Sequence, residues 1–395
     1  MTTTPVIDKY LSKHAEAEAE GVGEAPRTWT HGVCIPACAE GTGLLGTLET
    51  LSSARGASEA LVIIVVNGRC EAPASVHEQN QATLAALREA CGVGKGPFSW
   101  GALGGMGILV VDRASTGRCF PPKQGVGLAR KIAGDVALTL IRRGVLLHPW
   151  IRCTDADVQV PADYFEQLPA ALPGVSAAIT PFVHIPEGPP TQQQAMGIYD
   201  AYLQSYVDGL TRAGSPYAFH TIGSLISVDA HSYAVVRGIP KRLAGEDFYL
   251  LNKLAKVGRV HTLGGDPVRI RGRLSDRVPF GTGAALIDIG AALLSGGPIR
   301  AYDPRVFEGV GHWLAALKAF SANADLSQLR AAIAEVPDPI GPGLVAGLDS
   351  MGAFDAAEKA SEQVQGDPLY RRLMEWNDAF RTLKLVHALR DGGIA

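Results

Sequence analysis

The sequence contains a run of six apolar residues, Leu61 to Val66, in which five are β-branched and none is polar. Ile108 to Val111 repeats this composition. A strand of this kind is covered on both faces, because a strand with one wet face would alternate apolar and polar residues. The two runs therefore predict a sheet that is buried between layers of helices.

Helical stretches alternate with these strand-sized runs. Leu128, Ile132, Val136 and Leu140 recur every four residues, which places them on one stripe of a helix. Further strands are predicted over residues 33–35, 150–153 and 176–180. The alternation indicates an α/β fold with a doubly wound, mainly parallel central sheet flanked by helices. Ligands bind such a sheet beyond the carboxyl ends of its strands, so the residues that follow each strand are the first candidates for a site.

The chain has 395 residues, more than one average domain. We predict a polar N-terminal leader helix or loose arm over residues 1–28 and an α/β domain over residues 29–284. Residues 285–395 show apolar positions at helical spacing and are expected to form a C-terminal helical subdomain. This subdomain is expected to shape a substrate-binding site or to form a homodimer interface.

Composition excludes several classes of partner. The net charge of −3 provides no general basic field, so neither nucleic acid nor an anionic membrane is an expected partner. The longest apolar run, Ala60 to Val66, is far shorter than the roughly 18 residues of a transmembrane segment. The N-terminus does not have the pattern of a secretory signal. The six cysteines include no CxxC pair and are interpreted as reduced, mostly buried thiols of a cytoplasmic protein.

The sequence Thr154–Asp155–Ala156–Asp157 follows an apolar strand. Carboxylates two positions apart beyond a strand can both reach one divalent ion, and Mg²⁺ and Mn²⁺ prefer such hard oxygen ligands. An isolated pair of this kind is more often two loop aspartates that cap the next element. The preceding strand favours the metal interpretation.

Glu246 and Asp247 follow Gly245 at the start of a predicted helix. Acidic residues in the first turn of a helix interact favourably with its dipole, which would explain them without any catalytic role. A carboxylate is also a suitable general base for a hydroxyl group that attacks a substrate. The local sequence leaves both interpretations open.

Two further segments have the composition of phosphate-binding sites. Arg269, Arg271, Arg273 and Arg277 are spaced along a segment that is predicted to be extended, and arginine binds phosphate oxygens bidentately. The same pattern also fits a solvated edge strand. The segment from Lys123 to Arg130 contains glycines at a predicted helix start, where backbone N–H groups favour an anion.

The order and spacing of these motifs resemble those of the family 2 glycosyltransferases, which have the GT-A fold, over roughly residues 31–285. The stretch from Val33 to Glu40 resembles their first strand and nucleotide-lining turn, and Gly125 to Arg130 resembles their Gly-x-x-x-Ala-Arg helix start. The pairs Asp155–Asp157 and Glu246–Asp247 match their metal-binding and catalytic motifs. The stretch from Ser275 to Arg277 resembles the segment that closes over the diphosphate.

The resemblance implies a glycosyltransferase of the hexosyltransferase class. The donor would be a nucleotide-diphosphate sugar, such as a UDP- or GDP-sugar, and the acceptor a small molecule, a glycan or a lipid-linked group. Asn67 stands where the family often has an aspartate, which leaves the base of the nucleotide open. The residues implied in donor binding are Pro36, Ala37, Glu40, Asn67, Lys123, Gly127, Arg130, Asp155, Arg273, Ser275 and Arg277.

The resemblance also implies a mechanism. Mn²⁺ or Mg²⁺ on Asp155 and Asp157 would neutralise the leaving diphosphate. Asp247, assisted by Glu246, would take the proton of an acceptor hydroxyl that attacks from the opposite face of the sugar, which gives inversion. The first alternative is a retaining enzyme with His261 as a third metal ligand. The others are a sugar nucleotidyltransferase and a non-catalytic module that binds nucleotide sugars.

Overall fold

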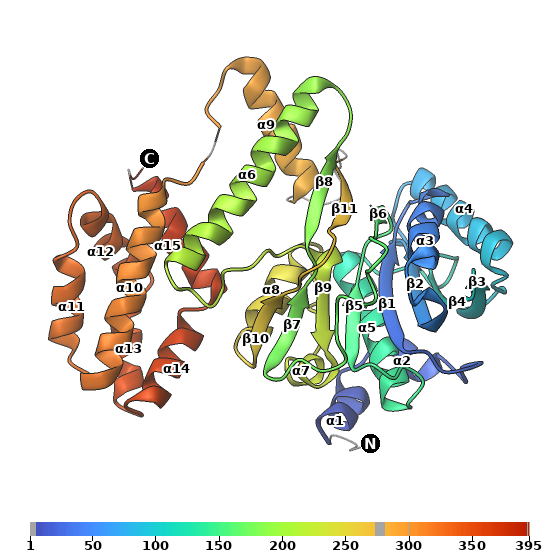
Figure 1. Ribbon diagram of the computed structural model, residues 1–395, viewed down its shortest axis with the longest axis horizontal. Coiled ribbons are helices and arrows are strands. Elements are labelled where there is room, and N and C mark those ends of the chain that lie inside the picture. Colours follow the sequence, from blue (N-terminus) through green and yellow to red (C-terminus); the bar gives the residue numbers. More distant parts are fainter. Residues whose placement is uncertain (1–4, 273–280, 300, 393, 395) are drawn as a thin grey trace. The chain divides into compact units, whose positions relative to one another are not determined.

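The computed structural model describes residues 5–272, 281–299, 301–392 and 394. It divides the chain into two compact units, which are drawn in Figure 1. The first comprises Met1–Met196 and Thr221–Asp288, and the second comprises Gly197–His220 and Ile289–Ala395. Residues 1–28 therefore belong to the same unit as the sheet. The sequence-based boundaries at residues 28 and 284 stay predictions.

The main sheet of the first unit has eight strands in the order β10-β7-β9-β5-β1-β2-β4-β3. All strands run in one direction except β3 and β9, which are antiparallel to their neighbours. The prediction of a mixed α/β fold with a mainly parallel sheet is thereby confirmed. The strands of this sheet are β1 (His31–Ala37), β2 (Ala60–Asn67), β3 (Phe98–Leu103), β4 (Met106–Arg113), β5 (Trp150–Cys153), β7 (Val175–Ile179), β9 (Ile226–Asp229) and β10 (Arg259–Thr262).

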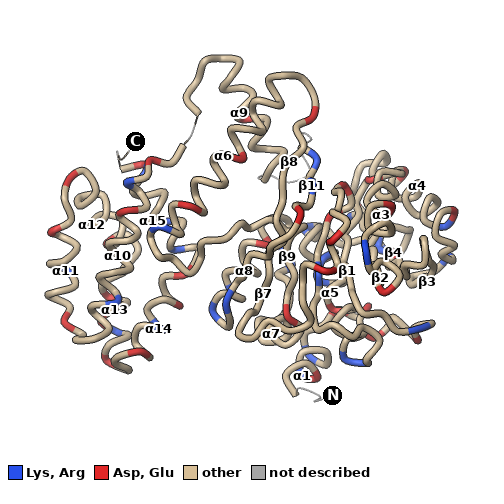
Figure 2. The backbone as a smooth tube through the Cα atoms, in the orientation of Figure 1, with Lys and Arg blue, Asp and Glu red and all other residues tan. Residues whose placement is uncertain are grey.

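A second sheet of three strands has the order β6-β11-β8. These strands are β6 (Val158–Gln159), β8 (Phe182–Pro186) and β11 (Val268–Gly272). The helices of the first unit flank the main sheet, and charged residues of both signs are interspersed along them (Figures 1 and 2). They are α1 (Pro5–Lys13), α2 (Glu18–Gly21), α3 (Gly43–Ser53), α4 (Ala74–Cys91), α5 (Val126–Arg142), α7 (Ala230–Val235) and α8 (Glu246–Leu254).

The apolar runs in the sequence form the centre of this unit. All eight residues of β2 are buried, as are the first seven of β4. Helix α5 lies against β1, β2 and β5, and its buried residues run without a break from Gly127 to Leu140. The predicted stripe of Leu128, Ile132, Val136 and Leu140 is therefore confirmed as buried, within a helix that is enclosed almost all round.

The second unit is helical in its described residues. Its core surrounds Trp313, which is fully buried and whose Nε1 donates a hydrogen bond to Asn377 Oδ1 at 3.1 Å. Helices α6 (Pro190–Arg212) and α9 (Thr282–Ser295) cross the boundary between the units. The others are α10 (Pro304–Asn323), α11 (Leu326–Ala334), α12 (Ile340–Ser350), α13 (Ala353–Ser361), α14 (Asp367–Trp376) and α15 (Ala379–Asp391). No described helix is both long and apolar enough to cross a membrane.

The expectation that all six cysteines are reduced is wrong for two of them. Cys70 and Cys119 form a disulfide. They are 49 positions apart and meet because the segments after β2 and β4 are joined by backbone hydrogen bonds, among them Cys70 N–H to the Phe120 carbonyl at 2.9 Å. Sequence spacing carries no signal of such a long-range pairing. Disulfides persist mainly in oxidising compartments, so the cysteines no longer support a cytoplasmic location.

The N-terminal segment is joined to α5 by buried polar groups. The Tyr10 hydroxyl donates to Asp135 Oδ1 at 2.5 Å, and the Lys131 ammonium group lies 2.8 Å from Asp135 Oδ2. Asp135 also accepts from the Tyr233 hydroxyl and from the backbone N–H of Glu16. This carboxylate therefore holds α1 and α7 on the central helix.

We expect Asp135→Ala to lower the free energy of unfolding by about 3–5 kcal/mol, because it removes the carboxylate closest to the buried Lys131. Asp8→Ala is the control, since it removes an exposed ion pair with Arg142 and should have little effect. Urea unfolding measures both. Equal effects of the two substitutions would contradict the role assigned to Asp135.

Candidate active site

The carboxyl ends of β1 and β2 lie side by side and carry residues that were predicted to bind the donor. Pro36 and Ala37 end β1, and Asn67 ends β2. The parallel register pairs Ala37 with Val66. Glu40 follows in the partly exposed turn after β1. The structure therefore brings these donor-site candidates together at the carboxyl ends of two neighbouring central strands.

Asn80 of α4 connects the two strand ends. It is fully buried, its Nδ2 donates to the Asn67 carbonyl at 2.9 Å, and its Oδ1 accepts from the backbone N–H of Ala39 at 2.8 Å. The Asn67 side chain in turn donates to the carbonyls of Ala37 and Val65. The sequence analysis missed Asn80, and a polar residue within the buried face of a helix is the only sequence signal for it. A contact between Asn67 and the nucleotide base stays a prediction.

Lys123 and Gly127 lie around the start of α5. Lys123 is exposed and has a φ of 63°, in the left-handed region. Gly127 is buried, and a Cβ there would lie 2.5 Å from the Arg242 carbonyl oxygen and 2.6 Å from that of Pro240. The close approach that this glycine allows is therefore to the chain's own backbone. Phosphate binding by this turn stays a prediction.

Arg130, farther along α5, joins two of the predicted acidic residues. Its Nη2 donates to Asp155 Oδ1 at 2.5 Å, and its Nη1 donates to Glu246 Oε1. Arg130 and Glu246 are both buried, with 7% and 2% of their surfaces exposed. A Cβ on Gly223 would lie 2.5 Å from Arg130 Nη1, so this glycine leaves the space that the guanidinium occupies. Arg130 and Glu246 thus meet although they are 116 positions apart in the sequence.

The surrounding carboxylates keep Arg130 charged. Burial acts to lower the pKa of Arg130, but the charges of Asp155, Glu246 and Asp247 raise it above its ordinary value. The guanidinium balances part of the negative charge that the cluster concentrates. Such a buried pair depends on both partners, because a desolvated charge left alone costs several kcal/mol.

Asp247 lies beside this pair, in the first turn of α8. Its Oδ1 accepts from the backbone N–H of Phe248 at 2.7 Å. Burial and the neighbouring charge of Glu246 raise the pKa of Asp247 to about 6, although Arg130 acts to lower it. A carboxylate of this kind is ionised at neutral pH and is a stronger base than an ordinary aspartate, which suits proton transfer.

Asp155 and Asp157 flank the buried Ala156 between β5 and β6. Both aspartates are partly exposed, in the short turn that joins the two strands. The pKa of Arg271 on β11 is raised mainly by its hydrogen bond to Glu187 and also by the charge of Asp157. The chain therefore passes near this aspartate pair just before residue 273.

Arg273, Ser275 and Arg277 were predicted to contact the diphosphate and lie outside the described residues. Their contacts stay predictions.

The structure does not bring His261 to the aspartate pair. His261 is on β10, at the edge of the main sheet, and β7 and β9 lie between β10 and β5. Three strand spacings of about 4.8 Å separate β10 from β5 by roughly 14 Å, too far for His261 to share an ion with Asp155. Strand β9, formed by residues 226–229 after α6, lies between β7 and β5. Local sequence patterns do not reveal this position in the sheet.

In the described ranges, no three His, Cys, Asp or Glu side chains converge to form a preformed metal site. Asp155 and Asp157 supply two partly exposed carboxylates in one turn, and Asp155 already accepts a hydrogen bond from a cation. Mg²⁺ sites in enzymes commonly consist of one or two carboxylates that are completed by water and substrate phosphates. The two aspartates fit a divalent ion shared with a diphosphate, rather than one held by the protein alone.

No family model matches the sequence, and no curated protein matches it. The solved structures that resemble this chain include S. aureus TarS 1–349 in complex with UDP-GlcNAc, with 12% identity and a TM-score of 0.41 over 88% of this chain and 91% of that one. The mannosyltransferase PcManGT from Pyrobaculum calidifontis, in complex with GDP-Man and Mn²⁺, has 15% identity and a TM-score of 0.36 over 96% and 95%.

Glucosyl-3-phosphoglycerate synthase from Mycobacterium tuberculosis, in complex with Mn²⁺, UDP and glucosyl-3-phosphoglycerate, has 15% identity and a TM-score of 0.34 over 74% of this chain and 85% of that one. All three TM-scores are below 0.5, so these likenesses do not identify a function for this chain.

We expect Arg130→Gln to lower the free energy of unfolding by about 3–5 kcal/mol, because it leaves the buried carboxylate of Glu246 without a cation. The double variant Arg130→Gln/Glu246→Gln should lose less than the sum of the single variants, since their shared interaction is removed only once. Urea unfolding of the four proteins gives the coupling energy.

The matched control is the exposed pair Arg55–Glu166, whose closest atoms are 2.6 Å apart. The same substitutions there should show almost no coupling, because water screens both charges. If the two cycles gave the same coupling, Arg130 would not have the organising role described here.

Proposed function

We propose that the chain is a GT-A type glycosyltransferase that transfers a sugar, with inversion, from a nucleotide-diphosphate donor to an acceptor hydroxyl. Mn²⁺ or Mg²⁺ would be required. The observation that carries the proposal is the cluster in which Arg130 joins Asp155, from the end of β5, to Glu246, beside the high-pKa carboxyl of Asp247. The resemblance of the sequence motifs to those of the family 2 glycosyltransferases supports the same function.

The donor nucleotide is proposed to lie over the carboxyl ends of β1 and β2. Pro36, Ala37, Glu40 and Asn67 line this edge, where ligands of mainly parallel α/β sheets bind. The bond from Asn80 to the turn after β1 holds this edge in one conformation before a ligand arrives. A UDP- or GDP-sugar is the proposed donor.

Asp155 and Asp157 are proposed to hold the divalent ion together with the diphosphate. An ion bound there would neutralise charge that develops on the departing diphosphate. The aspartates themselves provide two partly exposed hard oxygen ligands within one short turn, and such ligands are what the ion selects.

Asp247 is the proposed general base, and Glu246 and Arg130 are the positioning residues. Arg130 holds Glu246, and through it the first turn of α8, relative to the end of β5. Asp247 then accepts the proton of the attacking hydroxyl as the new bond to the anomeric carbon forms. The retaining alternative required His261 beside the metal, and the distance of β10 from β5 counts against it.

The high pKa of Asp247 favours an enzyme over a non-catalytic binding module. A folded-state pKa of about 6, above the ordinary 3.8 of an aspartate, makes the ionised carboxylate a cost to the fold at neutral pH. The carboxyl of Asp247 makes its full contribution to the free energy of unfolding below pH 3.8. This contribution is lost as the pH rises through about 6. Carboxyl groups whose pKa is raised in this way are found more often in active sites, because they can act as bases near neutral pH.

We predict that Asp247→Asn lowers donor turnover by about 10²-fold or more, the scale expected for loss of a general base. The melting temperature at pH 7.5 should stay the same or rise, because the costly charge is removed. Release of nucleoside diphosphate from UDP- and GDP-sugars in Mn²⁺ measures turnover, since water serves as acceptor. Wild-type turnover should fall as the pH drops through about 6.

The control is Asp229→Ala, which removes the cap that accepts from Ser232 N–H at the start of α7. It should cost about 1 kcal/mol of stability and leave turnover intact. If Asp247→Asn behaved like this control, with lower stability and full turnover, Asp247 would have only a structural role.

We predict that binding of UDP or GDP requires a divalent ion. Calorimetric titration should give strong binding with Mn²⁺ and a loss of about tenfold or more with excess chelator, because the ion screens the charges of diphosphate and aspartates from one another. Asp155→Ala and Asp157→Ala should match the chelated wild type even when Mn²⁺ is present. Equal affinity under all of these conditions would remove the metal from the proposal.

A further inference from the structure

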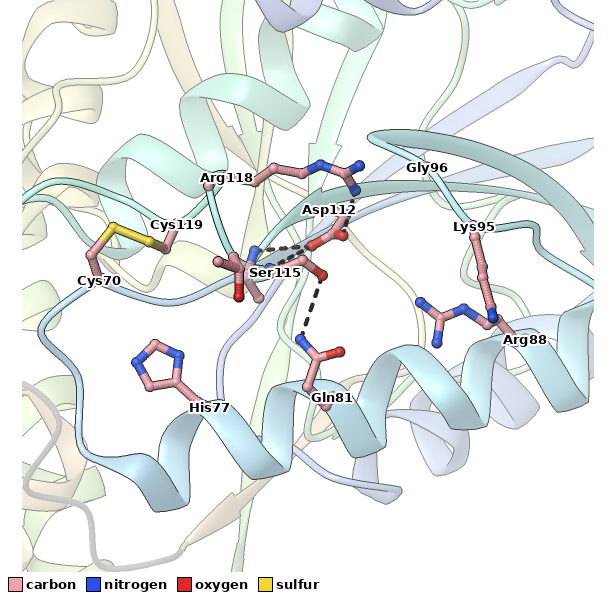
Figure 3. A pocket seen from close by; sticks show the side chains of 13 residues that line it. Cys70, His77, Gln81, Arg88, Lys95, Gly96, Asp112, Ser115, Arg118 and Cys119 are labelled. Carbon is pink, nitrogen blue, oxygen red and sulfur yellow. Dashed lines mark hydrogen bonds and ion pairs between the residues drawn. A yellow bond between two sulfur atoms is a disulfide. The ribbon is translucent and has the colours of Figure 1, made fainter.

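A cavity of about 760 Å³ lies between α4 and the segment that follows β4 (Figure 3). Cavities of roughly 300–1,000 Å³ commonly hold small-molecule ligands. None of the residues proposed above for the donor, the metal or the base lines this cavity. It is therefore a second candidate site in the first unit, and it does not depend on the proposed glycosyltransferase activity.

The acidic group in the lining, Asp112, is already satisfied by its own loop. Asp112 Oδ1 accepts from the backbone N–H groups of Ala114 and Ser115, and Oδ2 accepts from Arg118 at 2.8 Å. Burial acts to raise the pKa of Asp112, but the hydrogen bonds from Ser115, Ala114 and Arg118 outweigh it and lower the pKa. Asp112 therefore stays ionised, and its charge is balanced by Arg118.

The other cations in the lining, Arg88 and Lys95, have no acidic partner among the residues that the structure describes. No described residue forms an ion pair or side-chain hydrogen bond with Arg88 or Lys95, and Arg88 Nε is buried without a hydrogen-bond acceptor. In Figure 3 both side chains extend into the same end of the cavity, and His77 lies at the other end. Lys95 is exposed and Arg88 is half-buried. An anion between these two like charges would lower their mutual repulsion.

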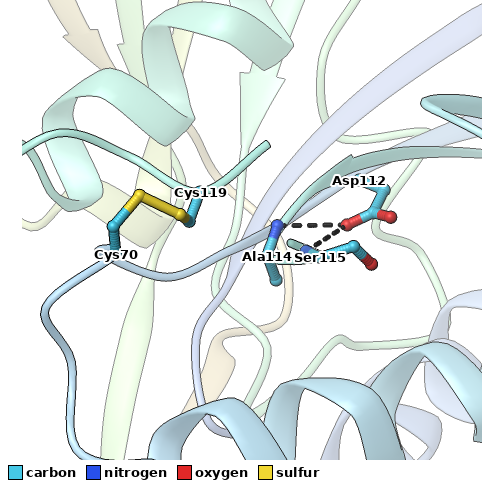
Figure 4. The surroundings of a disulfide bond; sticks show 5 residues. All are labelled: Cys70, Asp112, Ala114, Ser115 and Cys119. Carbon is cyan, nitrogen blue, oxygen red and sulfur yellow. Dashed lines mark hydrogen bonds between the residues drawn. A yellow bond between two sulfur atoms is a disulfide. The ribbon is translucent and has the colours of Figure 1, made fainter. Parts of the chain in front are cut away.

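The wall opposite α4 is covalently fixed. The disulfide between Cys70 and Cys119 ties the end of the Asp112–Arg118 loop to the segment after β2 (Figure 4). The backbone N–H of Arg118 also donates to the Ser115 carbonyl within this loop. Polar groups on a fixed wall lose little conformational freedom when a ligand binds.

We propose that this cavity binds a small molecule that carries a phosphate group. Arg88 provides a guanidinium that can bind two phosphate oxygens, and Lys95 provides a compact point charge. With the charge of Asp112 balanced, the two unpaired cations match the roughly two negative charges of a phosphate monoester. The cavity is larger than a phosphate ion, so the rest of the molecule would occupy the space toward His77.

The test is calorimetric titration of the full chain with inorganic phosphate and with glycerol 3-phosphate, in chloride buffer that contains a chelator. Both probes should bind to the wild type, glycerol 3-phosphate the more tightly. Arg88→Gln and Lys95→Gln should each weaken binding by about tenfold or more, the scale of one lost charge-assisted hydrogen bond. Arg259→Gln and Lys13→Gln, exposed cations outside the cavity, are the matched controls and should leave binding unchanged.

Asp155→Ala separates this proposal from the proposed activity, because it should abolish metal-dependent nucleotide binding and leave phosphate binding intact. Three results would overturn the site: no binding of either probe, affinities within about twofold of wild type in Arg88→Gln and Lys95→Gln, or equal losses in the control variants. Circular dichroism of each variant confirms that it is folded.

Discussion

The proposed chemistry depends on one buried guanidinium that joins carboxylates from distant parts of the chain. Arg130 is enclosed within the first unit, yet it remains charged because Asp155 and Glu246 both accept its hydrogen bonds. Arg130 and Glu246 are both buried, and either ion would be costly to bury without the other. The cluster thereby connects the end of β5, the N-terminal part of α5 and the start of α8.

This arrangement places the proposed base, Asp247, in a buried and negatively charged environment. Burial and the neighbouring charge of Glu246 raise the pKa of Asp247, while Arg130 acts to lower it. The same few groups would thus set the position of the proposed base and its proton affinity. Gly223 contributes by leaving space for the guanidinium, which shows that the site also depends on a residue with no side chain.

The sequence was most informative where local composition decides structure. The apolar runs in β2 and β4 predicted the buried sheet, because strands with no polar residue need two covered faces. It could not predict contacts that arise only when distant segments meet. Asn80 between two strand ends, the disulfide of Cys70 with Cys119, and β9 between β5 and the strand of His261 are all of this kind. The acidic pairs were found by motif, but the hydrogen bonds of Arg130 to Asp155 and Glu246 were not, and donor binding by Arg130 stays a prediction.

The most direct test of inverting sugar transfer is the configuration of the sugar that the enzyme releases. Proton NMR, recorded in the first minutes of donor hydrolysis with Mn²⁺, distinguishes the two anomers before they equilibrate in water. The account predicts that the first sugar to appear has the anomeric configuration opposite to that of the donor, because water is activated by Asp247 on the face opposite the diphosphate. Release of the retained anomer, or intact UDP- and GDP-sugars after prolonged incubation, would contradict it.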